Sequence, residues 1–129
     1  MNAQFSDRAI RSVALLVNPA AGGAKGDTVA GRAENRLRAH GLAVTRMVGE
    51  SADESVELAR RAVADGVDAL VVCGGDGMVS LAVQAQAFTD VPVGIIPAGT
   101  GNDLAREYGI PLGDPEAAAD IVAAGRVER

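Results

Sequence analysis

The sequence predicts an α/β fold in which a parallel sheet lies between two layers of helices. Short apolar runs alternate with longer amphipathic segments in the order βαβαβαβα, and the connections between them are short. The apolar runs are continuous, which is typical of strands covered on both faces. Strands that alternate with helices in this way build a three-layer parallel sheet with right-handed crossovers.

The composition fits one globular domain and excludes several kinds of partner. Of the 129 residues, 48% are apolar and 22% are charged, which is typical of a folded domain. Aromatic residues make up 2%, and the formal net charge is −5. The acidic balance argues against a nucleic-acid partner, and also against electrostatic adhesion of this part of the chain to anionic lipid.

The same totals indicate a cytoplasmic protein. A single cysteine excludes an intrachain disulfide and favours a reducing compartment. No apolar run approaches the roughly 18 residues of a membrane-spanning helix, and the N-terminus has no signal-peptide pattern. We expect cytoplasmic localisation, with peripheral membrane attachment of a full-length protein and homo-oligomer formation both left open.

The chain begins with a polar stretch, 1–7, that we expect to be frayed. The first strand is predicted at 13–17 and the first helix at 28–40, joined by a loop of small residues at 18–26. Gly41 suits the left-handed position after the helix. The helix residues predicted to face the core are Val29, Ala33 and Leu37. Those predicted to face outward are Arg32, Arg36 and Arg38.

The second strand, 42–48, contains Thr45 and Arg46, which suggest an edge position. Ser51 and Glu54 form a capping-box pattern at the start of a helix over 52–65, and Gly66 ends that helix. The residues predicted to be buried on this helix are Val56, Ala59 and Val63.

A third strand at 69–73 leads into a glycine-rich turn and then a helix over 78–87. The turn is Gly74-Gly75-Asp76-Gly77. Few polar residues follow, so this helix should be well buried, through Val79, Leu81, Ala82, Val83 and Ala85. A structural alternative for the turn is a tight βα connection with a capping Asp76.

The last part of the chain contains a strand at 93–96, bordered by Pro92 and Pro97. A loop at 98–103 follows, then a short helix at 104–108 and a final helix at 115–124. Proline near the start of the final helix and Gly125 after its end fit this assignment.

The loops after the first, third and fourth strands are all glycine-rich. A strand order of 2-1-3-4 would place these three loops side by side, at the point where strand order reverses. Ligands bind at such points in open α/β sheets, and glycine turns before helices present backbone N–H groups to phosphate. The sequence therefore predicts a phosphate site at this edge.

The common nucleotide and hydrolase motifs do not match. Residues 22–28 contain Lys25 and Thr28 without P-loop spacing, and 99–104 lacks the third glycine of a dinucleotide fingerprint and follows the fourth strand. There is no G-x-S-x-G motif. The single histidine, His40, lies at a predicted helix end, where it would complement the helix dipole.

Three motifs occur in order: Asn18-Pro19-Ala20-Ala21-Gly22-Gly23, Gly74-Gly75-Asp76-Gly77, and Gly99-Thr100-Gly101-Asn102-Asp103-Leu104-Ala105-Arg106. Together they resemble the catalytic domain of the diacylglycerol kinase and sphingosine kinase family of lipid kinases. The resemblance covers nearly the whole chain. It implies a Rossmann-like nucleotide-binding lobe similar to those of 6-phosphofructokinase and NAD kinase. It also implies ATP and Mg²⁺ as cofactors and a lipid hydroxyl as acceptor.

The resemblance also implies roles for residues. Asp76 would be catalytic, as a proton acceptor or a metal ligand, and Asp103 would support the metal. The residues expected to hold the nucleotide are Asn18, Gly22, Gly23, Gly74, Gly75, Gly77, Gly99, Thr100, Gly101 and Asn102.

This chain departs from the family pattern after the glycine turn. The family usually has Thr where this chain has Met78, often Asn at Ser80, and Glu at Leu81. The Thr hydroxyl could bind a phosphate oxygen, whereas Met78 could instead fill an apolar gap under the helix. A non-catalytic nucleotide-binding module and an NAD kinase relative therefore remain alternatives.

Family members carry a second, β-rich lobe that contributes much of the acceptor-lipid site. This chain stops near Val127, where the connection to that lobe would begin. We expect residues 8–129 to be the nucleotide-binding lobe alone, which would be inactive as a kinase without the second lobe. A natural single-domain protein is the alternative.

Overall fold

The computed structural model describes residues 10–17, 29–74, 76–86, 89–97, 110 and 114–124, and for Asp76 the backbone alone. The helices and strands are β1 (Ser12–Val17), α2 (Val29–Ala39), β2 (Ala43–Val48), α3 (Ala52–Ala64), β3 (Ala69–Gly74), α4 (Asp76–Gln86), β4 (Val93–Pro97) and α6 (Pro115–Ala123). The strands form a parallel sheet in the order β2-β1-β3-β4, which confirms the predicted order. The short helix predicted at 104–108 lies outside the described residues.

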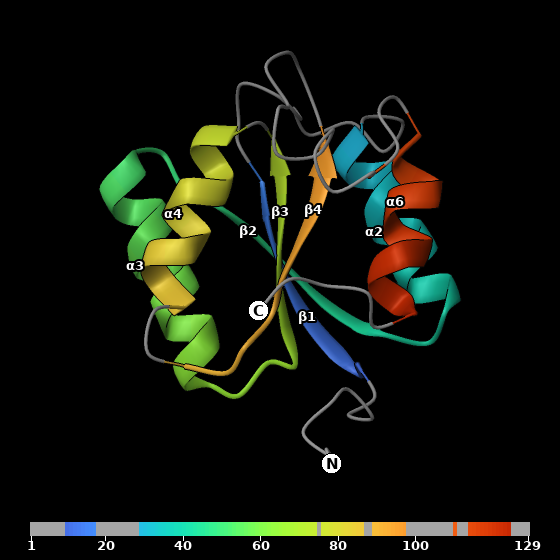
Figure 1. The fold of residues 1–129 in the computed structure, drawn as a ribbon, viewed down its shortest axis with the longest axis horizontal. Helices are drawn as coiled ribbons and strands as arrows, with labels where there is room; N and C mark the ends of the chain where they lie inside the picture. Colours follow the sequence, from blue (N-terminus) through green and yellow to red (C-terminus); the bar gives the residue numbers. More distant parts are fainter. Residues whose placement is uncertain are drawn as a thin grey trace.

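The sheet lies between two helical layers, as predicted (Figure 1). Helices α3 and α4 cover one face, and α2 and α6 cover the other. Alternate residues of β1 point to opposite layers: Leu15 packs with α2 and α6, whereas Leu16 packs with α3 and α4. Both leucines are completely buried. The continuous apolar run of this strand is therefore explained by burial on both faces.

Strand β2 lies at an edge of the described sheet, as Thr45 and Arg46 predict. Thr45 is exposed and Arg46 is half-buried. The Arg46 Nε lies 3.0 Å from the Glu34 Oε1 of α2, an ion pair that lacks hydrogen-bond geometry. A polar strand can occupy this position because one of its backbone edges pairs with β1 and the other does not.

Two helices end at glycines in the left-handed conformation. Gly41 has a φ of 86° and Gly66 a φ of 92°. After α2, the Leu42 N–H donates to the Leu37 carbonyl at 3.2 Å, and the Gly41 N–H donates to the Arg38 carbonyl at 2.9 Å. This pair of bonds is a Schellman ending, which requires positive φ and so favours glycine.

The capping box that begins α3 is confirmed with one difference. The Ser51 side chain accepts a hydrogen bond from the Glu54 N–H at 3.1 Å. The Glu54 carboxylate accepts a hydrogen bond at 2.7 Å from the N–H of Glu50, one residue before the cap. Two backbone donors at the helix start are thereby satisfied.

The buried face of α3 was predicted only in part. The residues that are buried on it are Ser55, Ala59 and Ala62. Val56 and Val63 are half-buried. Small side chains let this helix pack closely against its neighbours, so the valines lie at the sides of the contact.

Helix α4 differs from its prediction in its start and its burial. It begins at Asp76, two residues before the predicted start at Met78, so part of the glycine turn is helical. Val79, Ala82 and Ala85 are buried as predicted, but Val83 is 51% exposed. A helix in an outer layer buries one side only, whatever the polarity of its other side.

Candidate functional site

The carboxyl ends of β1, β3 and β4 lie side by side in the sheet. Val17 at the end of β1 is in register with Cys73, and Gly74 at the end of β3 is in register with Pro97. Neighbouring strands are about 4.8 Å apart, so the segments that leave these three strands start close together. The strand order reverses between β1 and β3 here, which confirms the predicted switch point.

The structure describes three of the predicted site residues at this edge. Gly74 is the buried last residue of β3, Asp76 is the first residue of α4, and Gly77 is the exposed second residue. Their backbone places the start of a helix directly after the central strand. The predicted site residues outside the described part are Asn18, Gly22, Gly23, Gly75, Gly99, Thr100, Gly101, Asn102 and Asp103.

Gly77 has no steric reason to be glycine. A Cβ built on it would meet no heavy atom of the described residues within 4 Å, and its φ is not among the positive ones. Gly49 is different, because a Cβ there would collide with Ser55 and lie 2.8 Å from the Ser55 backbone nitrogen. Glycine within a helix costs about 0.5–1 kcal/mol relative to alanine. Since neither packing nor conformation requires Gly77, close approach of a ligand to the backbone is a reason that remains.

Met78 packs into the core. It is 6% exposed and belongs to the same apolar cluster as Ala59, Ala82 and Leu16. The structure therefore favours the interpretation that Met78 fills an apolar gap under the helix over one in which residue 78 meets a phosphate. Ser80 is exposed on the opposite side of the helix.

The thiol beneath the glycine turn is chemically inert. Cys73 is fully buried, and this burial raises the pKa of its thiol to about 11, against an opposing effect of Arg46. A neutral buried thiol is a poor nucleophile and a poor metal ligand. Cys73 thus supports the turn by packing.

Among the described residues, no group of three acidic, histidine or cysteine side chains could hold a metal ion. The described helices also include none that is long and apolar enough to cross a membrane. Any metal site at this edge would therefore need Asp76, whose side chain is not described, or residues of the loops predicted from the sequence.

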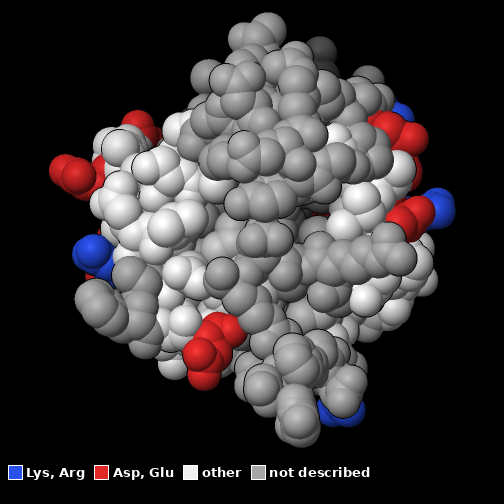
Figure 2. All heavy atoms as spheres, viewed as in Figure 1, with Lys and Arg blue, Asp and Glu red and all other residues white. Residues whose placement is uncertain are grey.

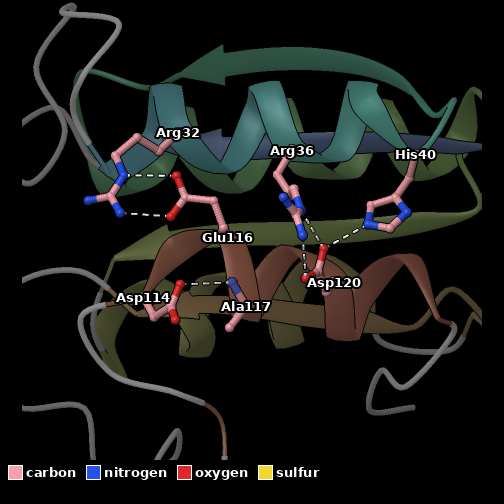
Figure 3. A network of polar contacts seen from close by, with 7 residues as sticks. All are labelled: Arg32, Arg36, His40, Asp114, Glu116, Ala117 and Asp120. Carbon is pink, nitrogen blue, oxygen red and sulfur yellow. Dashed lines mark hydrogen bonds and ion pairs between the residues drawn. The ribbon is translucent and has the colours of Figure 1, made fainter.

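Arg32 and Arg36 are exposed, as predicted, and both bind α6 (Figure 3). Arg32 donates from Nε and Nη2 to the Glu116 carboxylate at 2.9 and 2.7 Å. One turn further on, Arg36 donates from Nε and Nη2 to Asp120 at 2.7 and 3.1 Å. The His40 Nε2 lies 2.7 Å from the same Asp120 Oδ1. The two arginines thus form two bidentate pairs, and the Asp120 carboxylate also contacts His40.

These contacts lower the pKa values of both carboxylates. Hydrogen bonds from Arg36 and then His40 lower the pKa of Asp120 to about 2, and the hydrogen bond from Arg32 lowers the pKa of Glu116. On this side of the molecule acidic and basic atoms lie side by side (Figure 2). The signal in the sequence was the four-residue spacing of each pair, Arg32 with Arg36 and Glu116 with Asp120. This spacing can be recognised as a set of ion pairs only once α2 and α6 are known to lie on the same face of the sheet.

The fold and this edge define a class: three-layer α/β proteins with a glycine turn after the central strand, at the switch point of a parallel sheet. Residues 12–129 match the family model of the diacylglycerol kinase catalytic domain. The chain belongs to this family, which is a family of kinases.

Individual relatives agree with this assignment. The chain is 48% identical over 125 residues to a diacylglycerol kinase of Mycobacterium tuberculosis, an alignment that covers 97% of this chain and 40% of that protein. It is 38% identical over 76 residues to a diacylglycerol kinase of Bacillus subtilis, covering 57% of this chain and 25% of that one. A crystal structure of a diacylglycerol kinase from Bacillus anthracis superposes with a TM-score of 0.76 at 27% identity, covering 92% of this chain and 43% of that one. The chain spans at most about 40% of the length of these curated relatives.

Proposed function

We propose that this chain is the nucleotide-binding lobe of an ATP-dependent lipid kinase. The kinase would transfer the γ-phosphate of ATP to a lipid hydroxyl, on a diacylglycerol-like or sphingoid acceptor. The observation that carries the proposal is Gly77, an exposed helical glycine that neither packing nor φ requires, at the carboxyl end of the central strand.

The described geometry suits a phosphate. The first turn of a helix presents unpaired N–H groups and a partial positive charge, and both favour an anion. At α4 this turn follows a buried strand with two neighbours that end at the same edge. The missing Cβ of Gly77 leaves the backbone open to a ligand.

The remaining assignments extend the proposal to residues known from sequence alone. Asp76, the first residue of α4, would accept the proton of the lipid hydroxyl or bind Mg²⁺. Asp103 would support the metal. The glycines and polar residues of the first and third motifs would contribute backbone and side-chain donors to the phosphates.

Mg²⁺, when bound, would neutralise charge on the transferring phosphate. The fit of the described residues is partial. The open backbone at Gly77 and the position of Asp76 at a helix start suit a metal-bound phosphate, while the described side chains offer no metal cluster of their own. Phosphoryl transfer depends mainly on positioning and charge neutralisation, so a site of backbone amides and few side chains is sufficient.

The lipid would bind largely outside this lobe. The relatives named diacylglycerol kinase are longer than this chain by more than a factor of two. We propose that the additional length of such a protein supplies the acceptor site, and that the present chain alone binds nucleotide weakly without transferring phosphate.

The proposal is tested by titrating the isotopically labelled chain with Mg·ATP and following the backbone amide resonances. Gly74, Asp76 and Gly77 should shift, because they lie where the phosphate would bind. Helix α3 provides an internal reference in the same spectra. Shifts confined to α3, or an absence of binding at millimolar nucleotide, would reject the site.

A further inference from the structure

Helices α2 and α6 run side by side in the same direction and are joined in a fixed register. Arg32 pairs with Glu116, and Arg36 pairs with Asp120 one turn later on both helices (Figure 3). Each pair is bidentate. A bidentate arginine–carboxylate pair fixes orientation as well as distance, which a single-point ion pair does not.

The first of these pairs lies at the starts of both helices. Arg32 is the fourth residue of α2, and Glu116 is the second residue of α6. Helix α2 follows β1, and α6 runs beside α2 in the same direction, so both helices start at the carboxyl edge of the sheet (Figure 1). Arg36 and Asp120 lie one turn farther from that edge.

The apolar contact between these helices and the sheet combines large and small side chains: Leu37 of α2 and Val122 of α6 are among the largest fully buried side chains. Ala30 and Ala33 of α2 and Ala118 and Ala119 of α6 are completely buried in one cluster. The arginine forks add polar contacts of defined geometry to this apolar packing.

We infer that Arg32 and Glu116 are positioning residues for the nucleotide site, an inference that rests on the proposed function. The pair sets the spacing between the starts of α2 and α6 at the carboxyl edge of the sheet. Neither residue touches the nucleotide. Arg36 and Asp120 join the same helices but do so away from the site.

The chain offers a matched control for this inference. The side chains of Arg32 and Arg36 are each 46% exposed, and each makes a bidentate pair with α6. Arg32→Gln and Arg36→Gln should therefore lower the melting temperature by similar amounts. Mg·ATP affinity, measured by calorimetry on the 129-residue chain, should fall about threefold or more for Arg32→Gln and stay within about 1.5-fold for Arg36→Gln.

A charge exchange tests the pair itself. The double variant Arg32→Glu/Glu116→Arg should recover most of the lost affinity, because the same two groups are joined again in reverse. Arg32→Lys, a milder change, should lie between Arg32→Gln and the unsubstituted chain, since lysine keeps the charge without the fork.

The outcomes separate this inference from the proposed function. If the unsubstituted chain does not bind Mg·ATP, the proposed function fails and the positioning role fails with it. If the unsubstituted chain binds, but Arg32→Gln and Arg36→Gln weaken binding equally or not at all, the positioning role alone is wrong. A loss of affinity confined to Arg32→Gln, together with rescue by charge exchange, supports it.

Discussion

Replacing Gly77 by alanine should stabilise the protein and weaken nucleotide binding at the same time. The added Cβ would meet no heavy atom of the described part of the chain within 4 Å, so this part accepts it without a clash. Alanine in a helix is favoured over glycine by about 0.5–1 kcal/mol. With an unfolding entropy of about 2.1 cal/mol/K per residue, that gain raises the melting temperature of a chain of this length by about 2–4 °C.

The effect on binding should have the opposite sign. If a phosphate oxygen approaches the Gly77 backbone, the new methyl group displaces it and weakens a hydrogen bond to a charged group. Such a bond contributes about 1.5–3 kcal/mol, so Mg·ATP affinity should fall about 10- to 150-fold. Calorimetric titration and thermal unfolding of the same variant measure both quantities.

Ser80→Ala is the matched control for this prediction. Ser80 is exposed on the same helix one turn later, and alanine there also has the higher helix propensity. It should raise stability slightly and leave affinity unchanged. A Gly77→Ala variant that melts higher but binds Mg·ATP within about twofold of the unsubstituted chain would refute ligand contact at Gly77.

Three further predictions concern Asp120, Asp76 and Met78. The folded protein holds the pKa of Asp120 at about 2, below the usual 3.8, so its stabilising effect is present above about pH 4 and is lost as the pH falls through 2. The difference in unfolding free energy between the unsubstituted chain and Asp120→Asn should shrink over that window; a difference that is constant from pH 5 to 2 would contradict the ion pair. Asp76→Asn in a full-length protein should abolish most phosphoryl transfer and leave the melting temperature unchanged, and activity within about threefold would show that Asp76 is only a turn residue. Met78→Thr should lower the melting temperature without tightening nucleotide binding, because it buries a hydroxyl and removes apolar volume from the core; tighter binding would restore the phosphate-contact interpretation.

The order of the strands could be predicted because the sequence of each strand shows whether it is buried on both faces or lies at an edge. Continuous apolar runs identify strands buried on both faces, and the polar residues Thr45 and Arg46 identify an edge. The ends of α2 and α3 were equally readable, because left-handed glycines and the capping serine act within a few residues of chain. Each of these signals is complete in one short segment.

The direction of individual side chains was harder to predict. Apolar residues surround much of α4, so hydrophobic periodicity does not single out Met78 over Val83, and on α3 the adjacent residues Ala62 and Val63 are both apolar. The contact between α2 and α6 could not be found from either helix alone, since Arg32 and Glu116 are 84 residues apart. Prediction fails where the deciding partner lies on another element.

Glycine shows most clearly what the structure adds to the sequence. All glycines look alike as letters, and a glycine-rich turn by itself is compatible with a structural role as well as with a ligand. In the structure, Gly41 and Gly66 are required by positive φ, and Gly49 is required by its contact with Ser55. The fold accounts for these three glycines without any ligand. Gly77 satisfies neither condition among the described residues, although glycine as the second residue of α4 lowers the stability of that helix. A residue that costs stability and has no role in the fold is the kind that a binding site would retain, and the assignment of the nucleotide site depends on that difference.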